Sequence, residues 1–156
     1  MPIKRLLLIL IAALSIATPV AGDETTTPYW ASIRSSEVNM RAGPGEDYGI
    51  SWVYRREHLP IKVLRLKEGW RFVEDPGGTR GWMLARFLTR ERSAIVTGKG
   101  HADLREGASE SAKLLWRVEP GVVGLLGDCT TGWCELQIGQ HRGLMRQDRL
   151  WGAGNP

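Results

Sequence analysis

The chain is poor in the residues that build metal and redox centres, with two cysteines and three histidines among 156 residues. Cys129 and Cys134 are not spaced as C-x-x-C, and no second pair of Cys or His completes a set of four zinc ligands. His58, His101 and His141 lie in loop-like stretches without a nucleophile pattern beside them. We therefore expect no catalytic residue, no metal site and no cofactor.

The chain also lacks a strong excess of either charge, with 21 Lys and Arg against 17 Asp and Glu, a formal net charge of +4. Two of the basic residues, Lys4 and Arg5, precede the apolar run described next, and their removal lowers the net charge to +2. The remaining clusters, at residues 55–56 and 90–92, are short and scattered among acids. Nucleic-acid domains gather Lys and Arg on one face or helix, so a nucleic-acid partner is not expected.

The apolar run at residues 6–20 is shorter than the roughly 20 residues that a spanning helix needs. It follows Lys4 and Arg5 and ends near the small residues Ala21 and Gly22, which is the pattern of a secretory signal peptide. We expect residues 1–22 to be removed after Gly22, with cleavage after Ala17 or Ala21 and an uncleaved anchor as alternatives. The absence of a nearby Cys excludes a lipoprotein anchor, so the sequence predicts a periplasmic or secreted protein with no stable membrane anchor after cleavage.

Tryptophan and glycine are plentiful, with seven Trp and 19 Gly, and much of this content is repeated. The second half of the chain matches the first at an offset that drifts from 64 to 62 residues, which indicates a duplication with small loop deletions. The matched pairs are Asn39-Met40-Arg41-Ala42-Gly43 with Asp103-Leu104-Arg105-Glu106-Gly107, Trp52 with Trp116, Gly69-Trp70 with Gly132-Trp133, and Gly81-Trp82-Met83 with Gly143-Leu144-Met145.

Each copy has the pattern of short strands. Leu59, Ile61 and Val63 alternate at period 2, and residues 75–78 (DPGG) form a strong turn signal. Residues 84–88 suit one helical turn, and no long helical period is present in the mature chain. The sequence therefore predicts a polar tether (23–28), two small β-barrels (29–91 and 92–152) and a short tail (153–156). Because the linker at 90–92 is short and lacks Gly and Pro, we expect the barrels to pack as one rigid unit.

These repeats resemble the bacterial SH3 (SH3b) domains of exported proteins, and in particular a tandem subgroup seen in alphaproteobacteria. The resemblance implies an all-β fold with two tandem SH3-like β-barrels after the signal peptide. The residues that carry it are 38–45 (VNMRAGPG), Trp52, 59–63 (LPIKV), Gly69-Trp70, Gly81-Trp82-Met83 and Leu88.

Cys129 and Cys134 bracket four residues that would form a hairpin turn between paired strands. Facing positions on paired strands bring two cysteines within bridging distance, and export implies an oxidising compartment. We therefore expect a structural disulfide. A redox pair and a zinc site are the less favoured alternatives.

The tryptophans allow a packing role and a binding role. Trp52 and Trp116, like Trp70 and Trp133, recur at matched positions, which favours core or inter-barrel packing. Trp30 has no clear counterpart.

In the binding interpretation, Tyr48, Tyr54, Trp70 and Trp82 line an open groove of the first copy. Aromatic rings of this kind stack on sugar faces or extended peptides. The second copy is less well equipped, because Leu144 replaces Trp82 and nothing answers to the two tyrosines.

The leading hypothesis is a non-catalytic exported module that binds a cell-envelope component, either peptidoglycan or an envelope protein. The alternative is a structural accessory or inhibitory subunit that docks one protein without a ligand groove. A small cell-wall hydrolase is disfavoured, because the Cys and His of the cell-wall endopeptidases that carry such barrels require a separate catalytic domain.

Overall fold

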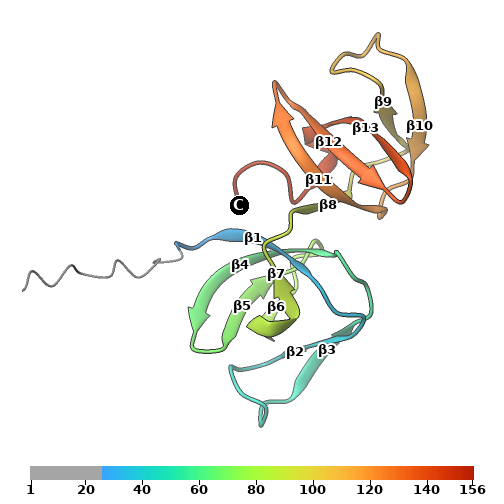
Figure 1. The fold of residues 1–156 in the computed structure, drawn as a ribbon. Coiled ribbons are helices and arrows are strands. Elements are labelled where there is room, and N and C mark those ends of the chain that lie inside the picture. The colour runs from blue at the N-terminus through green and yellow to red at the C-terminus, as the bar shows by residue number, and fades with distance from the viewer. Residues whose placement is uncertain (1–25) are drawn as a thin grey trace, which may run out of the picture.

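The computed structural model describes residues 26–156, so the expected signal segment and the start of the expected tether lie outside the described residues. The described chain forms two seven-stranded antiparallel sheets, each curled into a small barrel (Figure 1). This confirms the all-β fold with two tandem SH3-like barrels. None of the helices in residues 26–156 is long and apolar enough to cross a membrane.

Barrel 1 holds the first seven strands and one 3-10 turn, which lies within the stretch predicted to be helical. Its elements are β1 (Tyr29–Ile33), β2 (Val38–Arg41), β3 (Ile50–Tyr54), β4 (Pro60–Lys67), β5 (Trp70–Glu74), β6 (Arg80–Leu84), η1 (Ala85–Phe87) and β7 (Leu88–Thr89).

Barrel 2 repeats the plan. Its elements are β8 (Ser93–Val96), β9 (Ala102–Arg105), β10 (Leu114–Val118), β11 (Val123–Thr130), β12 (Trp133–Ile138), β13 (His141–Arg146), η2 (Gln147–Arg149) and β14 (Leu150–Trp151). The strand orders, β3-β2-β6-β5-β4-β1-β7 and β10-β9-β13-β12-β11-β8-β14, are the same order shifted by seven. The duplication seen in the sequence is therefore also a duplication of topology.

The matched residues explain why both halves fold alike. Met40 and Leu104 are fully buried at the same place in the two cores, as are Met83 and Met145. A glycine stands beside them in each copy: a Cβ on Gly81 would collide with the side chain of Met40, and a Cβ on Gly143 would lie 2.8 Å from that of Leu104. Strands β6 and β13 can therefore approach β2 and β9 this closely only with glycine at these positions.

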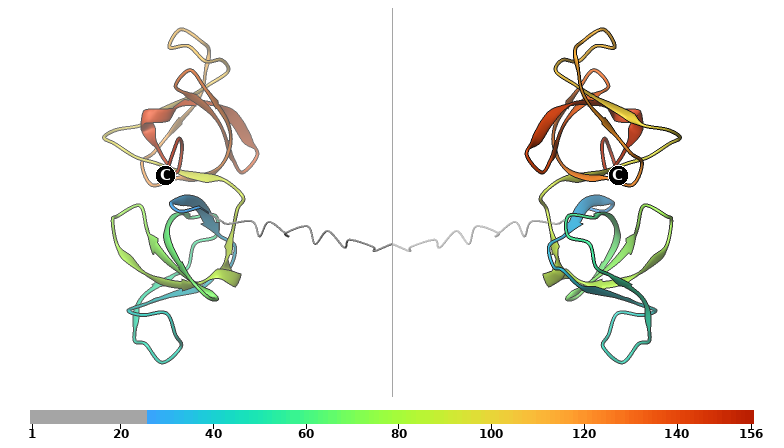
Figure 2. Two further views of the ribbon diagram at one scale, coloured as in Figure 1. Left: turned by 90° about the vertical axis from the view of Figure 1, so that its left-hand side faces the viewer. Right: turned by 90° about the vertical axis from the view of Figure 1, so that its right-hand side faces the viewer.

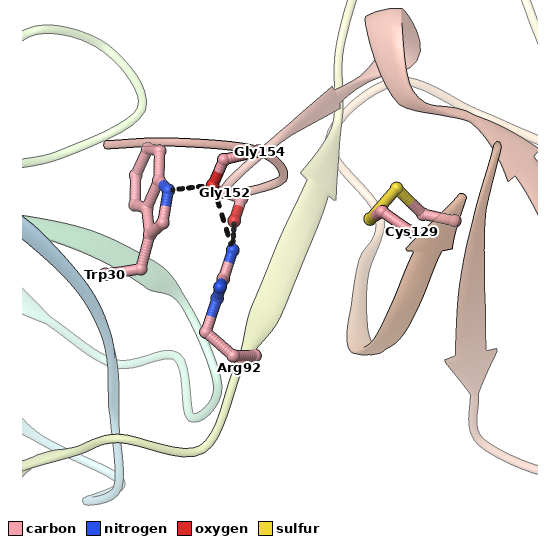
Figure 3. The surroundings of a disulfide bond; sticks show 6 residues. Trp30, Arg92, Cys129, Gly152 and Gly154 are labelled. Atoms are coloured by element: carbon pink, nitrogen blue, oxygen red, sulfur yellow. Dashed lines mark hydrogen bonds between the residues drawn. A yellow bond between two sulfur atoms is a disulfide. The ribbon is translucent and has the colours of Figure 1, made fainter. Parts of the chain in front are cut away.

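The two barrels lie one on the other, with β1, β8 and the C-terminal segment between them (Figure 2). Trp30 of β1 is 7% exposed, and its ring meets the ring of Trp151 edge to face at a centroid distance of 4.7 Å. Its indole Nε1 donates a hydrogen bond to the carbonyl oxygen of Gly154 at 3.0 Å (Figure 3). Trp30 thus joins the first strand of barrel 1 to the last residues that follow barrel 2.

Arg92, in the linker, strengthens the same junction. Its Nη2 donates to the carbonyl oxygens of Gly152 at 2.7 Å and of Gly154 at 3.4 Å (Figure 3). Partial burial lowers the pKa of the Arg92 guanidinium. Gly152 has a φ of 107°, and a Cβ there would lie 2.5 Å from the carbonyl oxygen of Ser93. Only glycine therefore lets the chain turn into this junction.

Apolar side chains complete the interface. Ile95 and Val123 of barrel 2 pack against the core of barrel 1. Ser32 Oγ donates to the carbonyl oxygen of Glu91 at 2.8 Å, which fixes the linker to β1. A 60-residue domain buries only about 60% of its unfolded surface and is marginally stable alone. The shared apolar contact therefore stabilises both barrels.

The disulfide is present as expected. Cys129 and Cys134 are bonded, and they face each other across the β11–β12 hairpin. Cys134 belongs to the core of barrel 2, whereas Cys129 lies on the exposed arm of the hairpin. The bridge therefore ties the end of this hairpin to the core.

We predict that Trp30→Ala uncouples the barrels. Loss of a buried Trp costs about 3 kcal/mol of unfolding free energy, and backbone ¹⁵N relaxation should then resolve two tumbling times where the unaltered protein shows one. Trp52→Ala is the matched control, because Trp52 is 58% exposed and its loss should change stability by less than about 0.5 kcal/mol. Independent tumbling in the unaltered protein would contradict the rigid unit.

We predict that Cys129→Ala with Cys134→Ala lowers the free energy of unfolding by about 2 kcal/mol, because the bridge closes a short loop in the unfolded chain. Denaturant unfolding of the pair variant measures the loss. Intact-mass analysis of the unaltered protein after alkylation without reduction supplies the check, and two alkylated thiols would show that the bridge does not form.

Candidate functional site

A row of four side chains crosses one face of barrel 1. Arg65 of β4 is paired with Phe72 of β5, Phe72 with Trp82 of β6, and Trp82 with Arg41 of β2. Because directly paired residues share a face of the sheet, the four side chains stand side by side across four neighbouring strands. We call this set, Arg65, Phe72, Trp82 and Arg41, the barrel-1 row.

The barrel-1 row consists of two adjacent rings with a cation at each end. The rings of Phe72 and Trp82 lie 5.2 Å apart and are tilted by 50°. The Arg65 guanidinium lies 4.3 Å from the Phe72 ring centroid and 5.8 Å from that of Trp82. Contacts of this length allow cation–π attraction, which holds the guanidinium over the rings. Both rings are half-buried, so each keeps a part of its surface open to a ligand.

Arg41 connects this row to the loop that carries Tyr48. Its Nη1 donates to the carbonyl oxygen of Tyr48 at 2.7 Å and to that of Glu46 at 2.9 Å. The Tyr48 ring packs against the backbone of Gly43, where a side chain would collide with it, and remains 50% exposed. Tyr48 is therefore a surface residue whose loop is held at the Arg41 end of the row.

The other two expected groove residues lie deeper. Tyr54 is 6% exposed and Trp70 is 9% exposed. The Tyr54 hydroxyl donates to Asp75 Oδ2 at 2.8 Å, and burial together with this carboxylate raises the pKa of Tyr54. Of the four residues, the structure thus leaves Tyr48 exposed and Trp82 half-buried, and it buries Tyr54 and Trp70.

The packing role expected for the matched tryptophans is right for one pair and wrong for the other. Trp70 and Trp133 are buried, at 9% and 7% exposure. Trp52 and Trp116 are 58% and 49% exposed. They lie on β3 and β10, the strands that begin the two sheet orders, and at these edges they have strand neighbours on one side only. The recurrence of a tryptophan at matched positions therefore indicates that the sequence was duplicated, but it does not indicate that the side chain is buried.

Sequence reasoning missed Arg41, Arg65 and Phe72 as members of the site. Phe72 stands two residues after Trp70, so the strand period would have placed the two rings on one face. Arg65 comes into the row through a register shift in the β4–β5 pair, and such a bulge has no sequence signal here.

Barrel 2 keeps the frame of the row and changes its chemistry. Arg105 stands in the place of Arg41 and is paired with Leu144, which is paired in turn with Glu135. Glu135 forms an ion pair with Arg142 at 2.5 Å. The equivalent face of barrel 2 therefore has no ring from these positions, which agrees with the expectation that the first copy is better equipped.

A second surface feature is a charged cleft of about 380 Å³ in barrel 2, over Trp133. Its guanidinium groups are engaged by the protein: Arg146 with Asp148 at 2.9 Å, and Arg149 with the carbonyl oxygens of residues 97 and 99–101. These bonds organise the loop before β9. Within residues 26–156, no group of three or more His, Cys, Asp or Glu is placed to hold a metal ion.

We predict a characteristic alkaline response from Tyr54. Its pKa is raised in the folded state above the value near 10 of an unfolded chain, so the unfolded state releases a proton first and stability falls as pH rises above about 10. Tyr54→Phe removes this titration, and its free energy of unfolding should decline less steeply between pH 10 and pH 11.5. Denaturant unfolding across this range measures both slopes, and equal slopes would contradict the buried phenol.

Comparison with known proteins gives one family match and several distant likenesses. The Bacterial SH3 domain profile matches residues 34–88 and 98–152. A Bacillus subtilis (strain 168) protein, YrvJ, named as a candidate N-acetylmuramoyl-L-alanine amidase, is 24% identical over 160 residues. The match takes in 96% of this chain and 30% of that protein, so the chain spans less than a third of the length of this relative.

Solved structures give weaker matches. NlpC2 from Trichomonas vaginalis matches with a TM-score of 0.37 and 13% identity, over 80% of this chain and 48% of that one. An NlpC/P60 family protein from Bacillus cereus ATCC 10987 matches with a TM-score of 0.36 and 15% identity, over 79% and 56% of the two chains.

Proposed function

Because the chain belongs to the bacterial SH3 domain family, in both of its barrels, we propose that it is a non-catalytic module that binds a component of the cell envelope. The binding face is the barrel-1 row, extended by Tyr48. The ligand is peptidoglycan, or else a protein of the envelope. We further propose that the signal-like segment at residues 1–22 directs the module to the periplasm or outside the cell.

The observation that carries this proposal is that two neighbouring rings stand between two guanidinium groups in one row. Flat rings stack on sugar faces or on extended peptides and contribute a large contact area. Guanidinium groups pair with carboxylates, in the best cases through two parallel hydrogen bonds. A polymer that offers both ring faces and carboxylates, as peptidoglycan does, matches the two kinds of group in this row.

Two further facts support the same ligand class. The amidase name of the Bacillus subtilis relative refers to a bond of peptidoglycan, and the alignment with that protein covers nearly all of this chain. In addition, the Arg65 guanidinium over the two rings and the bonds of Arg41 to the carbonyl oxygens of Glu46 and Tyr48 hold the face in place before a ligand binds. A face that is ordered before binding loses less entropy when the ligand arrives.

We predict that Trp82→Ala reduces retention of the two-barrel protein on purified sacculi by about tenfold, because one stacking ring contributes about 1.4 kcal/mol. Leu144→Ala, at the matched position of barrel 2, is the control and should leave retention unchanged. Circular dichroism and unfolding curves for both variants show that each remains folded.

The same assay separates the alternatives. No retention of the unaltered protein on sacculi would remove the peptidoglycan proposal, and crosslinking to one envelope protein through Tyr48 or Trp82 would then favour the protein ligand. Equal loss in the Trp82 and Leu144 variants would show that the row is not the binding face. Release of muropeptides by the purified protein would contradict the non-catalytic role.

A further inference from the structure

Barrel 2 contains a hollow at the place where barrel 1 has a tyrosine ring. In barrel 1 the Tyr54 side chain reaches from β3 past Met40 to Asp75, with its hydroxyl 3.9 Å from Met40 Sδ and 2.8 Å from Asp75 Oδ2. The matched residue in barrel 2 is Val118, which is too short to fill this space. The strand partners agree with the match, since Tyr54 is paired with Val38 and Val118 with Ala102.

The residues that line the hollow include the counterparts of residues that contact the Tyr54 side chain in barrel 1. The counterparts of the two residues that Tyr54 touches are Leu104 and Ile138, and both line a cavity of about 380 Å³ together with Val118 and Val122. The cavity lies between the β9–β10 hairpin and the turn that joins β12 to β13. Its volume is within the range of sites that hold small ligand groups.

The mouth of the cavity carries two rings. Trp116 is 49% exposed, and its ring centroid lies 3.9 Å from that of His141. In barrel 1 the matched Trp52 has the Tyr54 ring as its neighbour, at 6.5 Å. In barrel 2 the His141 ring thus lies beside the tryptophan in place of a tyrosine ring, and the space that the tyrosine fills in barrel 1 is open next to it.

We propose that this cavity is a binding site for one aromatic side chain of a protein partner, with phenylalanine preferred over tyrosine. A benzyl group restores the packing that Tyr54 supplies from within barrel 1, and Trp116 supplies a ring for edge or face contact. The preference for phenylalanine over tyrosine follows from the residue that replaces Asp75 in barrel 2. Where Tyr54 finds Asp75 as an acceptor, barrel 2 offers Ile138. The polar side chains of the lining are at exposed positions, so a hydroxyl buried beside Ile138 would lack a partner.

The site differs in place and in chemistry from the barrel-1 row. Figure 1 shows the β2–β3 and β9–β10 hairpins at opposite ends of the molecule. The row presents cations beside half-buried rings, whereas the cavity is lined by aliphatic side chains and, at exposed positions, by His101, Arg117, Glu119 and His141. The aliphatic part of the lining takes up an apolar group in preference to a sugar, because sugar hydroxyls there would lose their water partners.

The test is a titration of the two-barrel protein with N-acetyl-phenylalaninamide, followed by NMR. We expect saturable shifts at the Trp116 indole and the Ile138 methyl groups, at least threefold weaker binding of N-acetyl-tyrosinamide, and no saturable shifts with N-acetyl-alaninamide. Val118→Tyr combined with Ile138→Asp rebuilds the barrel-1 arrangement and should weaken binding at least tenfold. Trp52→Ala, at the matched exposed ring of barrel 1, should leave binding unchanged.

A second variant guards against misfolding of the first. Trp116→Ala alters an exposed side chain, leaves the core in place and should weaken binding of the phenylalanine probe at least threefold. Absence of saturable shifts in the unaltered protein would overturn the proposal. So would undiminished binding in a folded Val118→Tyr, Ile138→Asp variant, or tighter binding of N-acetylglucosamine than of the phenylalanine probe.

Discussion

The contact of Trp30 with Trp151 and Gly154 is the constraint on which the rest of this small molecule depends. Each barrel is near the size at which one hydrophobic core barely offsets the entropy of folding. By packing Ile95 and Val123 of the second barrel onto the core of the first, the junction lets two small cores share their apolar surface. Arg92 and Gly152 then fix the angle at which the chain passes between them.

Duplication produced two barrels with the same backbone arrangement, and the two proposed binding sites lie where matched residues of the barrels differ. The frame is kept by backbone bonds: Arg41 holds the carbonyl oxygen of Tyr48, and Arg105 holds that of Ala112 in the same way. Because the loop is closed by the arginine and not by the ring, Tyr48 can be exchanged for Ala112 without a change of fold. Other exchanges within the same backbone frame give an aromatic row on barrel 1, where barrel 2 has Leu144 for Trp82, and a cavity on barrel 2, where Val118 stands for Tyr54.

The sequence was sufficient for the fold, the repeat and the disulfide, because each depends on residues that recur or on a spacing. It was not sufficient for Trp30, since a search for repeats finds only what occurs twice, and this ring serves the one contact that the copies do not duplicate. The exposure of Trp52 and Trp116 depends on their edge strands, which local periodicity does not identify. The cavity beside Val118 is a difference between copies, visible only once Ile138 is aligned with Asp75 in space.

The bond between Trp30 and Gly154 joins residues 124 positions apart. During synthesis, β1 is therefore made long before Gly154, whose carbonyl oxygen accepts the hydrogen bond from Trp30. Until residues 151–154 emerge, the Trp30 indole has neither its ring neighbour nor its acceptor. The Trp30 part of the junction thus forms only after all the strands of both barrels have been made, and a chain that stops before residue 151 would contain the apolar contacts of Ile95 and Val123 without it.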